Sequence, residues 1–336
     1  MRFLLASVLS LGLVAAPPGA GLQVLKTLPV GGSGGWDYVA LDSSARRLYV
    51  PRSDRVLVLD LDGKPIGEVP GTDGVHGVAL APGLDRGFTS NGRSSTITIF
   101  RLSTLEILGQ VKATGEGPDA ILFDPATSRV FSFNGRGKNA TVFDAATGHA
   151  VGTIPFGHKP EFAATDGKGH VYVNLEDSAE VAVIDAKKLT VERRWSLAPL
   201  QDPTGMAIDL KHRRLFVVGG NKLMAVLDAD TGKIVATPAI GSGADGATYD
   251  PGLGLAFSSN GEGTLTVIRQ ESPDRYSVLE QLPTKRGART LALDEKTHWI
   301  YLPTAEFTPA PAPTAETPRP RPAMTPGSFQ ILVVGR

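Results

Sequence analysis

Cysteine is absent from the 336-residue chain. Disulfides, thiolate catalysis and cysteine-ligated metals are therefore excluded, and the fold must be stabilised by burial and by closure of its sheets. An excess of charge of either sign is also absent, since 34 Lys and Arg residues balance 34 Asp and Glu residues. Because proteins that bind duplex nucleic acid usually carry a basic excess, we expect no such partner.

Long hydrophobic runs are scarce as well. The one clear run, from Phe3 to Ala16, follows the positively charged Arg2 and precedes small residues and prolines up to Ala20. This layout is typical of a secretory signal peptide, and the run is too short for a stable transmembrane span; a buried N-terminal helix is the alternative. We therefore predict a signal peptide over residues 1–20, a periplasmic or extracellular location, and no transmembrane segment.

Convincing amphipathic helices are missing from the rest of the chain, which instead carries a repeat. Short apolar runs of β-prone residues, each closed by a turn residue, return about every 42 residues, a period typical of propellers and solenoids. The 39 Gly and 25 Pro residues indicate many turns. The copies of this hallmark motif are Phe88–Gly92, Phe131–Gly135, Val171–Asn174 and Phe257–Gly261, with looser copies at Leu48–Pro51, Leu215–Gly219 and Ile300–Pro303.

Each repeat contains four short strands. An apolar run precedes the hallmark motif, and a third and a fourth run follow it, separated by turns of Gly, Asp, Asn and Pro. Four-stranded units repeated radially make a β-propeller. We therefore predict an all-β, seven-bladed β-propeller with four antiparallel strands per blade. The seven copies of the first run end at Asp42, Ala81, Asp124, Asp166, Asp209, Asp250 and Asp294.

The seventh repeat lacks a fourth strand at its C-terminal end. A matching strand, Gln23–Val30, stands at the start of the mature chain. We predict that this strand completes the last blade, so that residues 22–336 form a single closed, monomeric propeller. Removing residues 22–30 would then expose an unpaired sheet edge, which promotes aggregation.

The hallmark motif, together with the turns Asp144–Gly148 and Asp228–Gly232, carries a family resemblance. The mature chain resembles the YVTN-repeat (YncE-like) family of seven-bladed propellers with WD40-like repeats. The resemblance implies a propeller fold and an exported bacterial protein, but no activity, because the signature residues look structural. Blades one, five and seven depart from the signature, at Pro51–Asp54, Gly219–Asn221 and Pro303–Glu306.

Residues 304–327 interrupt the last repeat with a segment rich in Pro, Ala and Thr. Such a composition favours an extended or disordered chain with too little apolar bulk to pack. We therefore expect a long surface excursion within the last blade. It is either a tolerated loop or a lid or partner-binding arm.

In an up-and-down blade, the start of the first strand and the end of the second meet at one face of the ring. Polar residues of different kinds precede the innermost strands there. If these positions packed in a core, they would carry similar apolar residues in every blade, so we expect a solvent-filled central funnel instead. The funnel is either simply hydrated, or it binds a small molecule or a hard divalent ion, Ca²⁺ or Mg²⁺, through four carboxylates and one histidine that converge on the axis. The expected lining is Asp37, His76, Asp119, Glu161, Thr204, Asp245 and Arg289, with Asp37, Asp119, Glu161 and Asp245 as the ion ligands.

A second set of charged residues follows the hallmark motif at the same face. Blades one to three carry arginines there, and blades four, six and seven carry glutamates. A basic arc of this kind suits an anionic or dipolar partner, although exposed turn charges are also a common surface feature. The arginines are Arg52, Arg93 and Arg136, and the glutamates are Glu176, Glu262 and Glu306.

Other motifs are structural or missing. The glycine-rich Gly31–Gly35 precedes a strand and not a helix, so it does not fit a phosphate-binding loop. No Ser-His-Asp arrangement, haem motif or covalent cofactor motif is present, so we assign no catalytic residue and no cofactor beyond the divalent ion named above. The acids that close the third strands are expected to bond turn amides: Asp60, Asp144, Asp185 and Asp228.

We interpret the chain as an exported binding or scaffold protein that recognises a small molecule or a protein partner at the mouth of its funnel. In this interpretation the arginines of the second set recruit the ligand. The alternative is a divalent-metal-dependent, lactonase-like hydrolase, a chemistry that propellers of related shape perform, in which the ion polarises a carbonyl and activates water. Electron transfer with a quinoprotein or haem partner is less favoured, because no cofactor motif is present.

Overall fold

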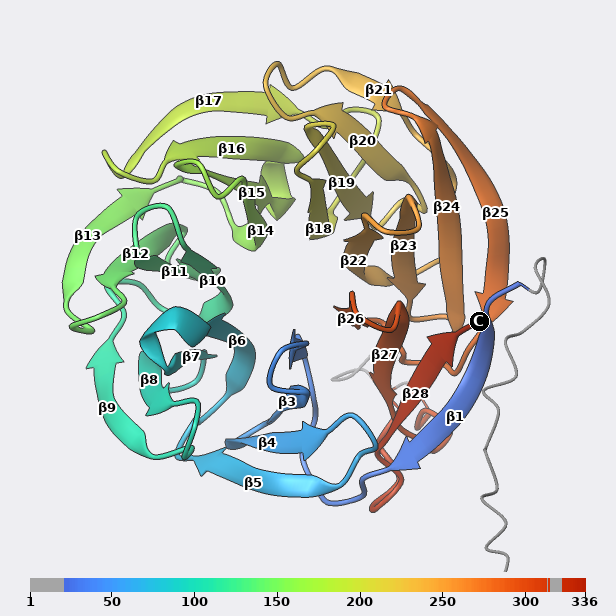
Figure 1. Ribbon diagram of the computed structural model, residues 1–336, viewed down its shortest axis with the longest axis horizontal. Helices are drawn as coiled ribbons and strands as arrows, with labels where there is room; N and C mark the ends of the chain where they lie inside the picture. The colour runs from blue at the N-terminus through green and yellow to red at the C-terminus, as the bar shows by residue number, and fades with distance from the viewer. Residues whose placement is uncertain (1–20, 313, 315–321) are drawn as a thin grey trace, which may run out of the picture.

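The computed structural model describes residues 21–312, 314 and 322–336, which form a ring of seven four-stranded antiparallel sheets (Figure 1). Helical structure in them is limited to two short 3-10 turns, η1 (Pro82–Leu84) and η2 (Glu176–Ser178). No helix in this part of the chain is long and apolar enough to cross a bilayer. The predicted seven-bladed propeller is confirmed. The predicted signal peptide lies outside the described residues.

Blades 1 to 3 each consist of four strands that are consecutive in sequence, with the first strand nearest the axis (Figure 1). Their second and third strands are rich in aliphatic and aromatic residues, which fit a pleated surface. The strands are β2 (Ala40–Asp42), β3 (Arg47–Arg52), β4 (Arg55–Asp60) and β5 (Pro65–Pro70), then β6 (Val75–Ala81), β7 (Arg86–Asn91), β8 (Thr96–Arg101) and β9 (Ile107–Lys112), then β10 (Pro118–Asp124), β11 (Arg129–Asn134), β12 (Asn139–Asp144) and β13 (Ala150–Pro155).

Blades 4 to 6 repeat the same arrangement. Burial is highest in the second strands; every residue of β19 and of β23 is buried. The strands are β14 (Pro160–Thr165), β15 (His170–Leu175), β16 (Glu180–Asp185) and β17 (Thr190–Ser196), then β18 (Pro203–Asp209), β19 (Arg214–Gly219), β20 (Met224–Asp228) and β21 (Ile234–Ala236), then β22 (Ala244–Asp250), β23 (Leu255–Asn260), β24 (Thr264–Ser272) and β25 (Arg275–Pro283).

Blade 7 is built from both ends of the chain. Its outermost strand, β1, pairs antiparallel with β28, and Leu28 of β1 is buried between blades 7 and 1. The prediction that the N-terminal strand closes the ring is therefore confirmed. Closure comes from main-chain pairing and apolar burial, without a disulfide. The strands are β26 (Ala292–Asp294), β27 (Trp299–Thr304), β28 (Gln330–Gly335) and β1 (Gln23–Pro29).

The asparagine of the hallmark motif joins neighbouring strands of one blade in blades 2, 3 and 6, whereas Asn174 of blade 4 donates to the carbonyl of Thr204 in blade 5. Asn91 donates through Nδ2 to Oγ1 of Thr96 and of Thr98, at 3.1 and 2.9 Å. Asn260 makes the equivalent pair of hydrogen bonds in blade 6. A buried amide is costly without partners, so these bonds explain why the motif returns with Asn at its end. The fully buried asparagines are Asn91, Asn134, Asn174 and Asn260.

The aspartates at the ends of the inner strands join neighbouring blades. Asp250 accepts turn amides through Oδ1, and its Oδ2 lies 2.8 Å from Nδ1 of His298 in blade 7. The third-strand acids accept turn amides as predicted, at Asp60, Asp144, Asp185 and Asp228. The blade-to-blade contact recurs from Thr165 to Asp124, Arg213 to Asp166, Gln270 to Asp209 and Arg46 to Asp294.

The described ends of the insertion pack against the ring. Phe307 and Met324 form an isolated antiparallel bridge, and the Thr308 amide donates to the carbonyl of Ala323 at 2.9 Å. The Phe307 ring lies 6.1 Å from that of Trp36. The expectation that the whole segment has too little apolar bulk to pack is therefore wrong at these ends, because Phe307 and Met324 supply that bulk.

We expect the β1 clasp to control stability. Leu28→Ala should lower the free energy of unfolding by about 2–5 kcal/mol, because the side chain is buried between two blades. Val24→Ala, on the exposed face of the same strand, should change it little. Both values come from denaturant unfolding.

Deletion of residues 22–30 tests the same clasp more severely. Light scattering should show aggregation, because the edge of β28 is then unpaired. A monodisperse deletion variant with the parent's melting curve would contradict closure by β1.

Candidate functional site

The inner strands begin with an irregularity that directs polar residues to one mouth of the ring. In β6 the pairing with β7 shifts register between Val75 and Val78, which leaves His76 and Gly77 outside the ladder. A β-bulge of this kind bends the strand and re-aims a side chain. Equivalent shifts occur at Asp119, Glu161, Thr204 and Asp245.

The hallmark motif of one blade holds the funnel residue of the next. Ser90 Oγ donates to the carbonyl oxygen of Asp119, and Ser259 Oγ donates to that of Arg289. Gly92 leaves space for an imidazole, because a Cβ there would lie 2.8 Å from the ring of His76. The repeat that determines the fold therefore also positions the site.

Asp37, His76 and Asp119 form a cluster across blades 1 to 3. His76 Nδ1 lies 2.6 Å from Asp37 Oδ2 and 3.5 Å from Asp119 Oδ1. Asp119 Oδ1 is buried and has no hydrogen-bond donor among the described residues. Since buried acceptors are normally satisfied, this oxygen favours a ligand with a hydrogen to donate or a positive charge.

Tyr38 connects the cluster in blades 1 to 3 with Glu161 of blade 4, across the axis of the ring. Its hydroxyl donates to Oε1 of Glu161 at 3.1 Å, and its ring centre lies 5.0 Å from that of Phe162. Blades 1 and 4 lie on opposite sides of the ring (Figure 1), so these two rings fill the axis beside the carboxylates. Lys159 Nζ lies 3.0 Å from Oε2 of Glu161 and also contacts Glu176.

Arg289 connects blade 7 to the acids of blades 6 and 1. Its Nε lies 3.0 Å from Asp245 Oδ2, and its Nη2 lies 3.6 Å from Asp37 Oδ1. Thr204, in contrast, uses its hydroxyl to bond the main-chain carbonyl of Ala244. The structure therefore gathers six of the seven predicted funnel residues into one charged cluster: Asp37, His76, Asp119, Glu161, Asp245 and Arg289.

Burial raises the pKa of three carboxyl groups in this cluster. The pKa of Asp119 rises to about 6, and those of Glu161 and Asp245 rise to about 7. Desolvation of the charged form is the main cause in each, and neighbouring carboxylates add to it. Burial lowers the pKa of His76, but the hydrogen bond that its imidazole donates to Asp37 and the charge of Asp119 outweigh this, so its pKa is raised.

The cluster holds more acids than permanent cations. When the acids ionise, the recess therefore carries an excess of negative charge. A bound cation would favour the ionised carboxylates and lower their pKa values. The acids are Asp37, Asp119, Glu161, Glu176 and Asp245, and the bases are Lys159, Arg289 and the titratable His76.

The predicted ion site of four carboxylates is not assembled as expected. The acid and imidazole atoms that lie within 4.8 Å of one another belong to Asp37, His76 and Asp119. Glu161 is instead engaged by Lys159, and Asp245 by Arg289. A metal in this recess would therefore have an imidazole among its ligands.

Arg52 does not lie at the rim as predicted. It is 0% exposed, and its guanidinium donates to the carbonyls of Gly31, Ser33 and Gly34 at 2.9 to 3.1 Å. It also lies 3.8 Å from the centre of the Phe329 ring. Arg52 is therefore unavailable to a ligand, and its role is to hold the glycine-rich loop on the core.

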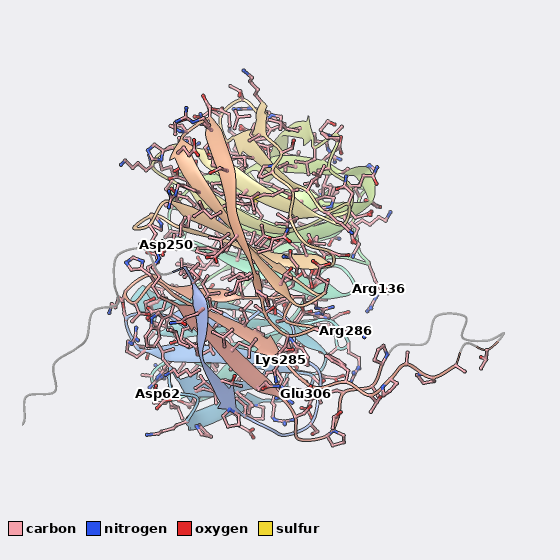
Figure 2. The ribbon with its side chains drawn as sticks, turned by 90° about the vertical axis from the view of Figure 1, so that its right-hand side faces the viewer. Asp62, Arg136, Asp250, Lys285, Arg286 and Glu306 are labelled. Atoms are coloured by element: carbon pink, nitrogen blue, oxygen red, sulfur yellow. The ribbon has the colours of Figure 1, made fainter. Side chains whose placement is uncertain are left out.

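Arg93 and Arg136 do lie exposed at the mouth. Arg93 pairs with Asp73 at 2.7 Å, and Arg136 donates to the carbonyl of Gly92 at 3.1 Å. Figure 2 places Arg136 and Arg286 toward the face from which the described ends of the insertion leave the ring. With Arg52 buried, the predicted basic arc is reduced to two side chains, one of them neutralised by an acid.

The rim glutamates also have partners. Glu306 pairs with Lys285 at 2.7 Å, and Glu262 accepts from Oγ1 of Thr264 at 3.1 Å. Glu176 turns inward to Lys159. The strong charges of the mouth therefore lie within the recess and not in two opposing arcs at its rim.

Three contributors to the site escaped the sequence analysis: Trp36, Tyr38 and Lys159. A signal for Tyr38 was present in the position after each funnel residue. That position is occupied by an aromatic residue in blades 1 and 4, as Tyr38 and Phe162, and these two rings meet at the axis. In the other long inner strands it is small, at Gly77, Ala120, Gly205 and Gly246.

A cavity of about 270 Å³ opens at this mouth. Its lining joins Asp37, His76 and Arg289 of the charged cluster to Arg93 at the rim, so a ligand entering from solvent meets Asp37 directly. The lining residues that matter for the site are Trp36, Asp37, His76, Arg93 and Arg289.

Comparison with known proteins identifies the fold alone. No family model matches the sequence, and no curated protein matches it. A chain of Kuenenia stuttgartiensis hydrazine synthase is similar in structure, with a TM-score of 0.69 and 14% identity over 86% of this chain and 96% of that one. A chain of a mitotic checkpoint complex gives a TM-score of 0.73 and 15% identity, over 90% and 95%.

Asp119→Asn should stabilise the protein at alkaline pH. The carboxyl group of Asp119 loses its proton near pH 4 in the unfolded state and near pH 6 in the folded state. Its ionisation therefore lowers the free energy of unfolding as the pH rises from about 4 to about 6, and this free energy stays lower above pH 6. We expect a gain of about 1–3 kcal/mol at about pH 8 and none at about pH 3.5. Asp73→Asn, at the exposed rim, is the control. Equal effects of Asp119→Asn at both pH values would contradict the burial of a charge here.

Proposed function

We propose that this chain is an exported binding protein whose central funnel takes a small ligand with a positively charged group. The fold and the site support a binding role: a closed ring presents one recess, and the charged groups of that recess come from separate blades. No described residue combines with others into a nucleophile and base arrangement that would favour covalent catalysis.

The buried carboxylates are the observation that supports a cationic ligand. Burying a carboxylate costs free energy unless it is paired and hydrogen-bonded. The raised pKa values of Asp119, Glu161 and Asp245 reflect that cost. A cation in the recess would offset it, and Asp119 Oδ1 is a buried acceptor with no donor of its own among the residues described.

A small molecule fits the recess better than a folded partner. The side chains of Asp37, Asp119 and Asp245 are only 15 to 19% exposed. The groups that would engage the ligand therefore lie inside the mouth, while Arg93 and Glu306 at the rim are already paired with Asp73 and Lys285. A cavity of about 270 Å³ lies just below the usual range of small-molecule sites, which begins at about 300 Å³, so it suits only a small ligand.

A divalent ion at Asp37, His76 and Asp119 is the second candidate, and it would serve the lactonase-like hydrolase. The mutual proximity of these three side chains favours it. Ca²⁺ and Mg²⁺ prefer oxygen ligands, whereas an imidazole suits zinc and other transition metals. Because His76 must lose its proton to bind a metal, its raised pKa opposes metal binding at lower pH.

Thermal shift and calorimetry with methylamine, Mg²⁺, Ca²⁺ and Zn²⁺ test the proposal. Methylamine should bind at about pH 8 and lose affinity by about pH 5, because the acids become protonated. Asp119→Asn should weaken binding at least about tenfold, or about 1.4 kcal/mol. Glu262→Gln, at the rim, should leave it unchanged. Binding of a metal but of no amine would favour the hydrolase, and binding of neither would remove the proposed function.

We further propose membership of the YVTN-repeat family and export through residues 1–20. The hallmark motif and the N-terminal apolar run support both. Intact-mass analysis of protein from the native cells should find a chain shortened by about 20 residues, the usual length of a signal peptide. A mature chain that keeps Met1 would contradict export.

A further inference from the structure

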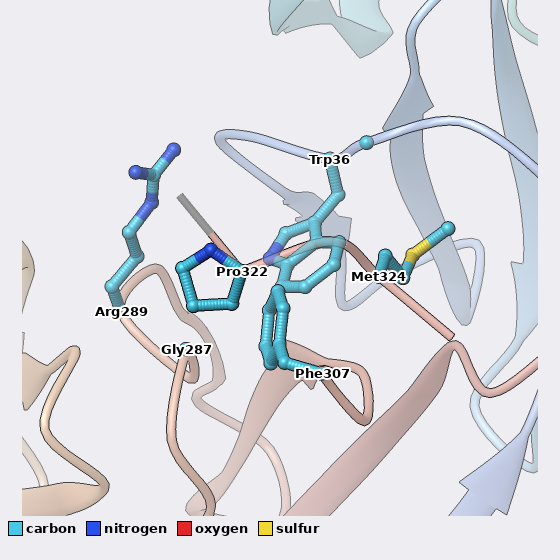
Figure 3. A pocket seen from close by; sticks show the side chains of 7 residues that line it. Trp36, Gly287, Arg289, Phe307, Pro322 and Met324 are labelled. Atoms are coloured by element: carbon cyan, nitrogen blue, oxygen red, sulfur yellow. The ribbon is translucent and has the colours of Figure 1, made fainter. Parts of the chain in front are cut away.

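An apolar cavity lies beside the acidic recess, beneath the base of the insertion. Its volume is about 290 Å³. Figure 3 shows the indole of Trp36 and the ring of Phe307 at its centre, with Met324 on one side and Arg289 on the other. The full lining is Gly35, Trp36, Gly287, Arg289, Phe307, Pro322 and Met324.

The aromatic wall of this cavity is anchored in the core. The Arg52 guanidinium lies 3.8 Å from the Phe329 ring centre, Phe329 lies 5.2 Å from Trp36, and Trp36 lies 6.1 Å from Phe307. Arg52 and Phe329 are both buried. Trp36 therefore cannot swing away without disturbing the core, so this wall is formed before any ligand arrives.

The insertion supplies the opposite wall. Its two described ends are held together by the bridge between Phe307 and Met324. Gly287, at φ +85°, lets the Phe307 ring approach, because a Cβ there would lie 2.7 Å from it. The described ends of the segment between β27 and β28 are therefore part of a cavity wall and not only a tolerated loop.

The apolar cavity and the acidic recess adjoin. Gly35, Trp36 and Arg289 line both. Trp36 is followed directly by Asp37, so the aromatic wall and the first carboxylate come from consecutive residues. One small molecule can therefore place an apolar body against Trp36 and Phe307 and a charged end at Asp37.

We propose that the ligand is a small apolar monoamine, with its aromatic ring or short alkyl chain in this cavity and its ammonium group at Asp37 and Asp119. The ammonium group of this ligand rests on the proposed function, whereas its apolar part is inferred from the cavity. An apolar cavity of about 150 Å³ already holds a benzene ring, so the volume here accommodates one. The aromatic faces also favour a neighbouring ammonium group.

Arg289 argues against a polyamine. Its guanidinium stands where the two cavities meet and is paired with Asp245 at 3.0 Å. A second ammonium group entering the apolar cavity would meet this positive charge and would lose its hydration without an acid to replace it. The geometry therefore favours one charged end and one uncharged end.

Calorimetry on the full mature chain tests the proposal with matched probes: methylamine, 2-phenylethylamine and the uncharged 2-phenylethanol. At about pH 8, 2-phenylethylamine should bind about tenfold to a hundredfold more tightly than methylamine, the gain expected from burying one aromatic side chain. 2-Phenylethanol should bind more weakly than the amine of the same shape. Spermidine should show no advantage over methylamine.

Two variants test where the extra affinity of 2-phenylethylamine comes from. Trp36→Ala and Met324→Ala should each reduce the preference for 2-phenylethylamine over methylamine. Met324→Ala keeps the test possible if Trp36→Ala folds poorly, because it removes little from the core. Ile66→Ala, an exposed apolar residue on the outer strand of blade 1, is the matched control and should leave this preference unchanged.

The outcomes separate this inference from the proposed function. Equal affinity for the two amines would overturn the apolar pocket and leave the cation site standing. Tighter binding of 2-phenylethylamine that Met324→Ala and Trp36→Ala do not affect would place its ring elsewhere and overturn the pocket as well. Failure of every amine to bind would overturn both.

Discussion

Convergence of seven inner strands on one axis is the constraint on which the whole site depends. Radial repetition brings residues that are far apart in sequence, such as Tyr38 and Glu161, into hydrogen-bonding distance. The convergence holds only while the ring is closed, and closure rests on the pairing of β1 with β28. The hydroxyls of Ser90 and Ser259 then fix each blade against the next, because they donate hydrogen bonds to the main-chain carbonyls of Asp119 and Arg289.

The two ends of the inner strands use the same chemical group in opposite ways. At the strand ends, Asp166 and Asp209 are buried, but main-chain amides and neighbouring side chains donate to them, so their pKa values are lowered despite burial. At the mouth, Asp119 and Asp245 receive fewer donors, and burial raises their pKa values. Satisfied acids stabilise the fold, whereas under-satisfied acids of this kind are candidates for a ligand-binding site.

Much of the fold and part of the site could be predicted from the sequence. The repeat predicted the blades and the closing strand, because its period and strand pattern depend on local side-chain character. It also predicted the funnel residues, because they occupy equivalent positions in each blade. The burial of Arg52 could not be predicted, since an arginine at the end of a strand is usually exposed, and only the fold shows that the carbonyls of Gly31, Ser33 and Gly34 surround it. The pocket beneath the insertion likewise depends on Phe307 reaching across to blade 1.

The funnel buries carboxylates, and a bound cation would stabilise their ionised form. Carboxyl ¹³C NMR titration of Asp119, Glu161 and Asp245 in the mature chain measures this directly. We expect midpoints of about 6, 7 and 7, which fall when a ligand amine is added. Midpoints near the ordinary value of about 4 for all three, unchanged by any cation, would contradict it.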